Sequence, residues 1–182
     1  MRSVFPCDKM ACVDNAKELV VKQMKRRKRI FLVLAIIWML VISAFSSRTG
    51  DLSATDSGRI GRLIGQVLVP GFEDWSEEKQ NQFAEKVDYP VRKTAHATEY
   101  AILGMLLVGA YTDKEKGRFV RLLIPWFIGT IYAATDEIHQ LFVPGRSGQI
   151  SDVCLDSIGV LIGVFLLWVI TEIKWKKEKR SL

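Results

Sequence analysis

Two histidine–carboxylate groups in this 182-residue sequence have the residue types and spacing for acid–base chemistry. His96 precedes Glu99 by three residues, so the two lie on adjoining lines of a helix surface. The run 135–146, TDEIHQLFVPGR, holds the second group. A histidine beside a carboxylate is the usual device for moving protons near neutral pH. The predicted catalytic candidates are His96, Glu99, Asp136, Glu137 and His139.

The same five residues offer a variant in which they hold a divalent metal ion, since histidine and carboxylate ligands suit zinc or manganese. The sequence has no HExxH motif and no ligand set with diagnostic spacing. We therefore expect no cofactor, and we keep a divalent metal as the alternative.

Polar residues at neighbouring positions could bind an anion. Guanidinium suits phosphate because it donates two parallel hydrogen bonds. Lys93, His96 and Tyr100 are three and four residues apart, so they can share one helix face. The predicted substrate-binding residues are Arg48, Arg92, Lys93, Tyr100, Gln140, Arg146, Asp152 and Asp156.

Four apolar blocks must position these polar groups. Hydrophobic residues make up 49% of the chain and are gathered rather than spread. A helix of about 20 apolar residues crosses a bilayer, so flanking residues must complete the shorter blocks. We predict an all-α polytopic membrane protein with four transmembrane helices, at 30–45, 94–111, 119–134 and 153–170, and a short-helical extracytoplasmic loop at 46–93.

Basic residues set the expected topology. The clusters at 25–29, 114–121 and 174–180 fall on one side of a four-span protein, and the positive-inside rule makes that side the cytoplasm. The segments assigned inside hold 18 of the 26 Lys and Arg residues but 7 of the 20 acidic residues. We expect a multi-pass protein of the cell membrane with both termini cytoplasmic. Juxtamembrane clusters without a binding fold argue against a nucleic-acid partner.

The loop 46–93 is expected to contain two short helices. Apolar residues recur at helical spacing between 60 and 68, and Pro70 and Gly71 interrupt the pattern. A separate polar helix is predicted from Ser76 to about Val87. We favour a linker folded onto the membrane surface over a lid that grips substrate.

This topology brings the polar residues of four helix ends to one extracytoplasmic face. A carboxylate at the bilayer centre costs about 2.5–3.5 kcal/mol on insertion scales. The polar stripes of three helices should therefore face the interior of the bundle and form a pocket.

The motifs, in this order, resemble those of the VanZ-like membrane proteins. The resemblance covers about 45–163 and departs at Arg48, where the family often has Gln, so that a phosphate contact is allowed there. It rests on Phe45-Ser46-Ser47, on Val91 to His96 with Glu99-Tyr100 and Leu103-Gly104, on Asp136 to Gly148, and on Asp152 and Asp156 leading to Gly159.

The resemblance implies a VanZ-like four-helix membrane domain over 30–172, between basic cytoplasmic segments at 1–29 and 173–182. The family's namesake is associated with resistance to the glycopeptide teicoplanin, which acts at the cell-wall precursor on the outer membrane face. We therefore expect an envelope protein associated with glycopeptide resistance. No settled enzymatic activity comes with the family, so catalysis stays an open question.

Three functions fit these residues. The pocket binds or modifies a membrane lipid or a lipid-linked, anionic envelope precursor, it is catalytic, or charged pairs such as Lys93 with Asp136 and Arg146 with Asp152 only lock the helices. We favour the first, because nonpolar packing would hold helices at a lower desolvation cost. The small-residue spacing of Gly159 and Gly163 allows close packing within the bundle or in a homo-oligomer.

Overall fold

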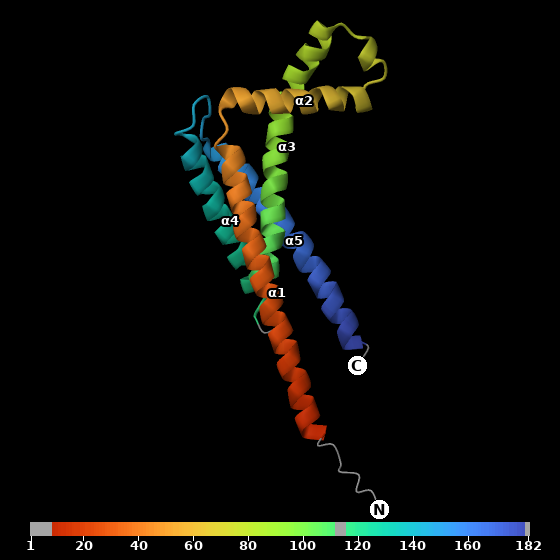
Figure 1. Cartoon of the computed structure of the whole chain (residues 1–182), viewed down its shortest axis with the longest axis vertical. Helices are drawn as coiled ribbons and strands as arrows, with labels where there is room; N and C mark the ends of the chain where they lie inside the picture. Colours follow the sequence, from red (N-terminus) through yellow and green to blue (C-terminus); the bar gives the residue numbers. More distant parts are fainter. Residues whose placement is uncertain (1–8, 112–115, 181–182) are drawn as a thin grey trace, which may run out of the picture.

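The computed structural model describes residues 9–111 and 116–180, and this part of the chain is helical without strands. The elements are α1 (Lys9–Ser46), α2 (Gly50–Leu68), the 3-10 helix η1 (Phe72–Asp74), α3 (Glu77–Tyr111), α4 (Arg118–Gln140) and α5 (Ile150–Arg180). Figure 1 shows α1, α3, α4 and α5 along the long axis and α2 across one end; α1 begins and α5 ends at the opposite end. The predicted all-α class is confirmed.

Helix α3 lies at the centre of the bundle and packs against α1, α2, α4 and α5. It approaches α5 closely where Gly159 and Gly163 meet Ala97 and Ala101. A Cβ atom on Gly163 would lie 1.8 Å from the Ala101 carbonyl oxygen, so only glycine fits there. The small-residue spacing therefore serves packing within the chain. The core is Ala35, Ile42, Tyr100, Leu103, Leu107, Val108, Ala133, Val160 and Val164.

The predicted helix start at Ser76 is confirmed, but the predicted end near Val87 is wrong, because α3 continues from Glu77 through Pro90 to Tyr111 without a break. A proline inside a helix leaves the carbonyl four residues earlier without its hydrogen bond. Here that residue is Lys86, and both it and Pro90 are exposed. Solvent can satisfy the freed carbonyl, which explains why the helix is not interrupted.

The predicted break at Pro70 and Gly71 is confirmed, since α2 ends at Leu68 and Gly71 adopts a left-handed conformation with φ of 71°. The chain then turns back so that Phe72 packs on Gly65, with no room for a Cβ atom on that glycine. Phe72 and its aromatic neighbours, Trp75 and Phe83, have ring centroids 5.2 to 6.3 Å apart. The loop is thus a folded unit on α3.

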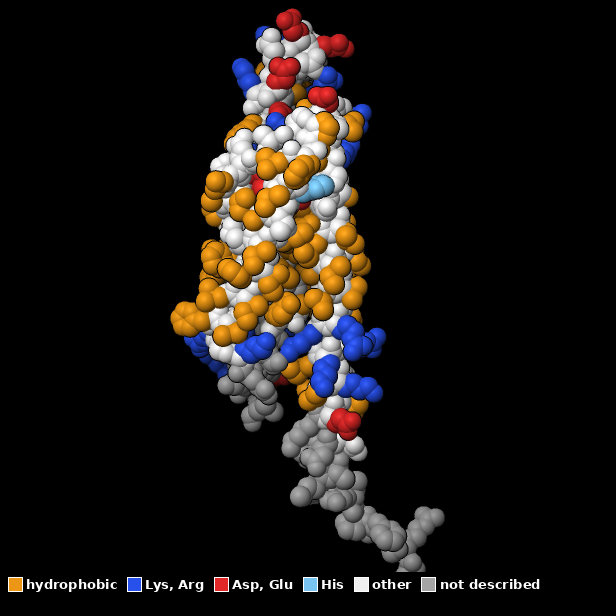
Figure 2. Space-filling view, turned by 90° about the vertical axis from the view of Figure 1, so that its left-hand side faces the viewer, with side chains coloured by type: hydrophobic (Ala, Val, Ile, Leu, Met, Phe, Trp, Pro, Cys, Tyr) orange, Lys and Arg blue, Asp and Glu red, His pale blue; other side chains and the backbone are white. Residues whose placement is uncertain are grey.

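The surface and two helices indicate a membrane protein. The segments Glu18–Ser46 and Ile150–Glu178 are long and apolar enough to cross a membrane. Figure 2 shows a belt of hydrophobic side chains between Lys and Arg at one end and mixed charges at the other. Helices α3 and α4 are not apolar enough over a membrane-spanning length to be counted with them. The first half of α3 is polar, and α4 carries charged residues near both ends. Lys114, of the predicted basic cluster, lies outside the described residues.

Candidate functional site

A tight glycine contact sets the position of the loop between α4 and α5. Gly145 has a φ of 73°, which favours glycine, and the Gly50 backbone N–H donates to the Pro144 carbonyl at 3.0 Å. A Cβ atom on Gly50 would lie 2.1 Å from the Gly145 carbonyl oxygen. The start of α2 therefore sits directly on this loop, which carries Arg146.

Arg146 holds the loop to the end of α1. Its Nε donates to the Arg48 carbonyl at 3.1 Å, and its Nη2 lies 3.4 Å from the Phe45 carbonyl. A cation is favourable at this negative end of a helix dipole. The suggested pair between Arg146 and Asp152 is wrong, because Asp152 pairs with Lys93 instead.

Asp136 joins α4 to α1 and is not among the residues that line the two cavities. The Ser46 hydroxyl donates to its Oδ2 at 2.6 Å, and Gln140 Nε2 donates to the same oxygen at 3.2 Å. Asp136 is buried. The suggested pair between Lys93 and Asp136 is therefore also wrong, and the Asp136 contacts are those of a helix-packing group.

Glu137, the next residue, connects α4 to α5. Its Oε1 accepts from Gln140 Nε2 at 3.0 Å, and its Oε2 accepts from the Gln149 backbone N–H at 3.0 Å. A carboxylate that accepts a free backbone amide at a helix start satisfies one of the unpaired donors there. Unlike Asp136, Glu137 lines a cavity.

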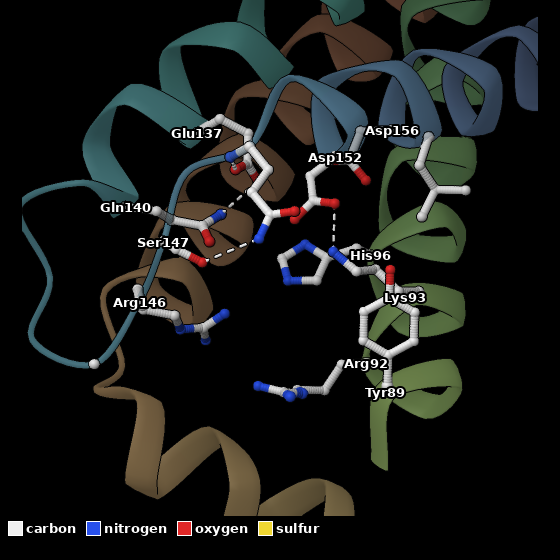
Figure 3. A pocket seen from close by; sticks show the side chains of 13 residues that line it. Tyr89, Arg92, Lys93, His96, Glu137, Gln140, Arg146, Ser147, Asp152 and Asp156 are labelled. Carbon is white, nitrogen blue, oxygen red and sulfur yellow. Dashed lines mark hydrogen bonds and ion pairs between the residues drawn. The ribbon is translucent and has the colours of Figure 1, made fainter. Parts of the chain in front are cut away.

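That cavity of about 200 Å³ lies between α3, α5 and the α4–α5 loop. Figure 3 shows the guanidinium groups of Arg92 and Arg146 turned toward one another across the hollow, with the His96 ring beside it. The cavity is lined by Tyr89, Arg92, Lys93, His96, Glu137, Gln140, Gly145, Arg146, Ser147, Gln149, Asp152, Leu155 and Asp156.

A second cavity of about 180 Å³ adjoins the first. Arg92, His96 and Arg146 line both of them, so these three side chains form a shared wall. The second cavity is more apolar, and it includes residues at the end of α1 and along α2. Its other lining residues are Phe45, Arg48, Ser53, Asp56, Ser57, Ile60, Val91, Ala95 and Glu99.

The arginines around the cavities are neutralised to different extents. Arg92 pairs with Asp88 at 2.7 Å, and Arg48 pairs with Asp56 at 2.5 Å. Within 9–111 and 116–180, no carboxylate forms an ion pair with Arg146, whose partners are carbonyls. Burial, and next the charge of Arg92, lowers the pKa of the Arg146 guanidinium, while the carboxylates Asp136, Glu137 and Glu99 act in the opposite direction. Arg146 is therefore the arginine of the cavities whose hydrogen-bond partners are neutral carbonyl groups.

Two groups lining the first cavity lack partners in the described part of the protein. Both carboxylate oxygens of Asp156 and the Nδ1 atom of His96 are buried without a hydrogen bond. Asp156 is 1% exposed. Since most buried polar side-chain atoms in proteins have a partner, these atoms point to a ligand or to ordered water.

The structure separates the remaining predicted site residues. His139 is exposed, and its Nε2 lies 3.0 Å from the Ser47 hydroxyl, away from both cavities. Tyr100 is wholly buried in the core, whereas Glu99 lines the second cavity. In the described part of the chain, no group of three or more His, Cys, Asp and Glu side chains is placed to hold a metal ion. The five residues suggested as ligands are thus not gathered as one set.

Several residues of the site were not predicted from the sequence. Asp88 stands four residues before Arg92, and this helical spacing is a signal that could have identified the pair. Asp56 and Ser57 reach the site only because α2 folds back over α3, where Ser57 hydrogen-bonds Asp88. No local pattern identifies such residues.

Comparison with known proteins places this arrangement in a family. The VanZ/LLP1 family model matches residues 31–171, which include every residue that lines the two cavities. No curated protein and no solved structure matches the chain. The match covers most of the sequence, and the chain belongs to the VanZ/LLP1 family.

Proposed function

We propose that this protein is a multi-pass membrane protein of the cell envelope that binds the phosphate-bearing headgroup of a lipid or lipid-linked precursor. In this arrangement α1, α3, α4 and α5 cross the membrane and both termini are cytoplasmic. The hydrophobic belt supports it, since Lys and Arg side chains lie at one end of the belt (Figure 2). The cavities are lined by residues of α2 and of the α4–α5 loop, which lie at the other end of the bundle (Figure 1).

One observation carries the proposed binding role. Arg92, His96 and Arg146 line both cavities, and the Arg146 guanidinium has no carboxylate partner in the described chain. A phosphate between the two guanidinium groups would accept several charge-assisted hydrogen bonds and relieve their repulsion. The apolar wall of the second cavity would contact the start of an acyl chain.

The same binding gives a role in glycopeptide resistance. Teicoplanin acts on the cell-wall precursor at the outer membrane face, and the proposed pocket opens at that face. A protein that holds an envelope lipid or precursor at this face would change how much of the precursor the antibiotic can reach.

The alternative function is structural, and two contacts favour it. Asp136 joins α4 to α1 through Ser46, and Lys93 joins α3 to α5 through Asp152. In that case the charges only lock the bundle, and no ligand is needed.

Lipid retention separates the two functions. Full-length protein in phosphatidylcholine nanodiscs is titrated with acyl-chain spin-labelled phosphatidylglycerol, and the motionally restricted fraction is measured by EPR. Arg92→Gln should lower retention about tenfold, while Arg59→Gln, an exposed arginine of α2 outside both cavities, should leave it unchanged. Equal retention by both variants and the wild type would reject binding at this site.

Cells supply the second test. Arg92→Gln should abolish any protection against teicoplanin at unchanged membrane abundance, whereas loss of the protein itself would favour the structural function. Topology is tested by labelling Ser147→Cys with an impermeant thiol reagent in a background where the native cysteines are replaced by serine. Labelling only after the cells are opened would overturn the proposed orientation.

A further inference from the structure

Asp156 is the group in this site that the contacts of the protein itself do not explain. It lies on α5, one turn after Asp152, and lines the first cavity at 1% exposure. Neither of its carboxylate oxygens has a hydrogen-bond partner among the described residues. A buried carboxylate without a donor is strongly unfavourable, so a donor from outside the chain is expected.

The other carboxylates near it already have donors. Asp152 pairs with Lys93, and Glu137 accepts from Gln140 and from the Gln149 backbone amide. Asp156 is therefore the acid of the first cavity whose oxygens remain available. Arg92 and Arg146 line the same cavity, so a ligand there would meet both guanidinium groups and a carboxylate.

The size of the first cavity limits the ligand. Its volume of about 200 Å³ equals the share of roughly six or seven liquid water molecules, at about 30 Å³ each. A small headgroup fits this space. The adjoining cavity, with Phe45, Ile60 and Val91 in its wall, would take the apolar part of the same molecule.

We propose that the ligand is amphoteric: a phosphate held by Arg92 and Arg146, joined through a short linker to a primary amine that donates to Asp156. A primary ammonium has three N–H donors, whereas a quaternary amine has none and a hydroxyl has one. The inference rests on the proposed headgroup binding and adds the chemical class of the headgroup. His96, which lines both cavities, lies where it can contact the phosphate.

Paired lipid probes test the amine. Full-length protein in phosphatidylcholine nanodiscs is given spin-labelled phosphatidylethanolamine or phosphatidylglycerol, which share a phosphodiester and differ in the amine. The wild type should retain phosphatidylethanolamine about tenfold more strongly than phosphatidylglycerol. Asp156→Asn should reduce this preference to near unity, and Asp51→Asn, an exposed acid outside both cavities, should keep it.

Soluble O-phosphoethanolamine, added as a competitor, shows whether the site takes any amino-phosphate or only a lipid that carries one. Displacement of the spin-labelled lipid identifies a site for any amino-phosphate, and absence of displacement restricts the ligand to lipids; both keep the amine requirement. Equal retention of the two lipids by the wild type overturns the inference, and so does a preference that survives Asp156→Asn.

The two proposals fail differently. If phosphatidylglycerol binds and depends on Arg92 but phosphatidylethanolamine gains nothing, the headgroup site stands and the amine is rejected. If neither lipid responds to Arg92→Gln, the headgroup site itself is rejected. The comparison of the two lipids uses the wild-type protein alone, so it tests the amine even if Asp156→Asn does not fold.

Discussion

Arginines lie toward both ends of the bundle, and their surroundings differ in one respect. Near the start of α4 and the end of α5, the buried Arg121 lies 2.7 Å from Glu172, and its guanidinium carbon lies 4.7 Å from the centre of the Trp175 ring. Arg146, in the α4–α5 loop, bonds to carbonyls and has no carboxylate partner in the described chain. The charge of Arg121 is thus paired with a carboxylate inside the protein, whereas Arg146 lines a cavity and forms no ion pair with a carboxylate in the described chain. This difference separates a packing contact from the candidate site.

The largest loss of stability is expected when the ion pair between Arg121 and Glu172 is broken. Glu172→Gln leaves the buried Arg121 without its counter-ion, which should lower the free energy of unfolding by about 3–5 kcal/mol. Thermal unfolding in detergent, followed by circular dichroism, measures the loss. The double variant Arg121→Leu with Glu172→Leu should recover most of it, and a double variant as unstable as Glu172→Gln would contradict the pairing.

A smaller loss is expected at the contact between α1 and α4. Asp136→Ala removes the acceptor of the Ser46 and Gln140 hydrogen bonds, which should lower the free energy of unfolding by about 1.5–3 kcal/mol. The same unfolding assay is applied to Ser46→Ala and to the double variant. If the free-energy losses of the two single variants add up to the loss of the double variant, the hydrogen bond contributes nothing.

At Asp156, by contrast, a substitution is expected to raise the free energy of unfolding. Asp156→Asn replaces an unmatched buried carboxylate with a neutral amide of similar shape, so stability without ligand should rise by about 1 kcal/mol while the lipid preference is lost. A loss of stability like that of Glu172→Gln would place Asp156 among the packing contacts.

The smallest effect is expected at His139. This exposed residue lies outside both cavities, so His139→Ala should change the free energy of unfolding by less than about 0.5 kcal/mol and leave phosphatidylglycerol retention unchanged. His96→Ala is the matched variant, and it should lower retention severalfold. Equal retention by the two variants would remove His96 from the site.

The all-helical fold, the break after α2 and the gathering of polar residues could be predicted from the sequence. Hydrophobic blocks, a Pro-Gly pair and polar residues at helical spacing carry these signals. The continuity of α3 could not, because it depends on the exposure of the Lys86 carbonyl. Two membrane-spanning segments are supported by composition and length, and four remain a prediction.

The pairing of the charges was the least predictable part. Asp136 and Glu137 are adjacent in sequence, yet successive helix residues point about 100° apart, so one packs on α1 and the other lines the cavity. Lys93 had several carboxylates within plausible reach, and the helix packing that selects Asp152 involves the glycines of α5. Residue type pointed to the region of the candidate site, but tertiary packing decided which contacts each residue makes.

The contacts made by Arg146 also determine when the site can form during biosynthesis. Its partner Arg48 is 98 positions away in the chain, and Ser46 and Asp136 are 90 positions apart. Contacts of such long sequence separation close large loops and form late in folding. Since Asp156 lies beyond all of these residues, a chain that stops after α4 would have neither side of the cavity complete. The end of α1 must therefore wait until the α4–α5 loop and the last helix have been made before the cavity is complete.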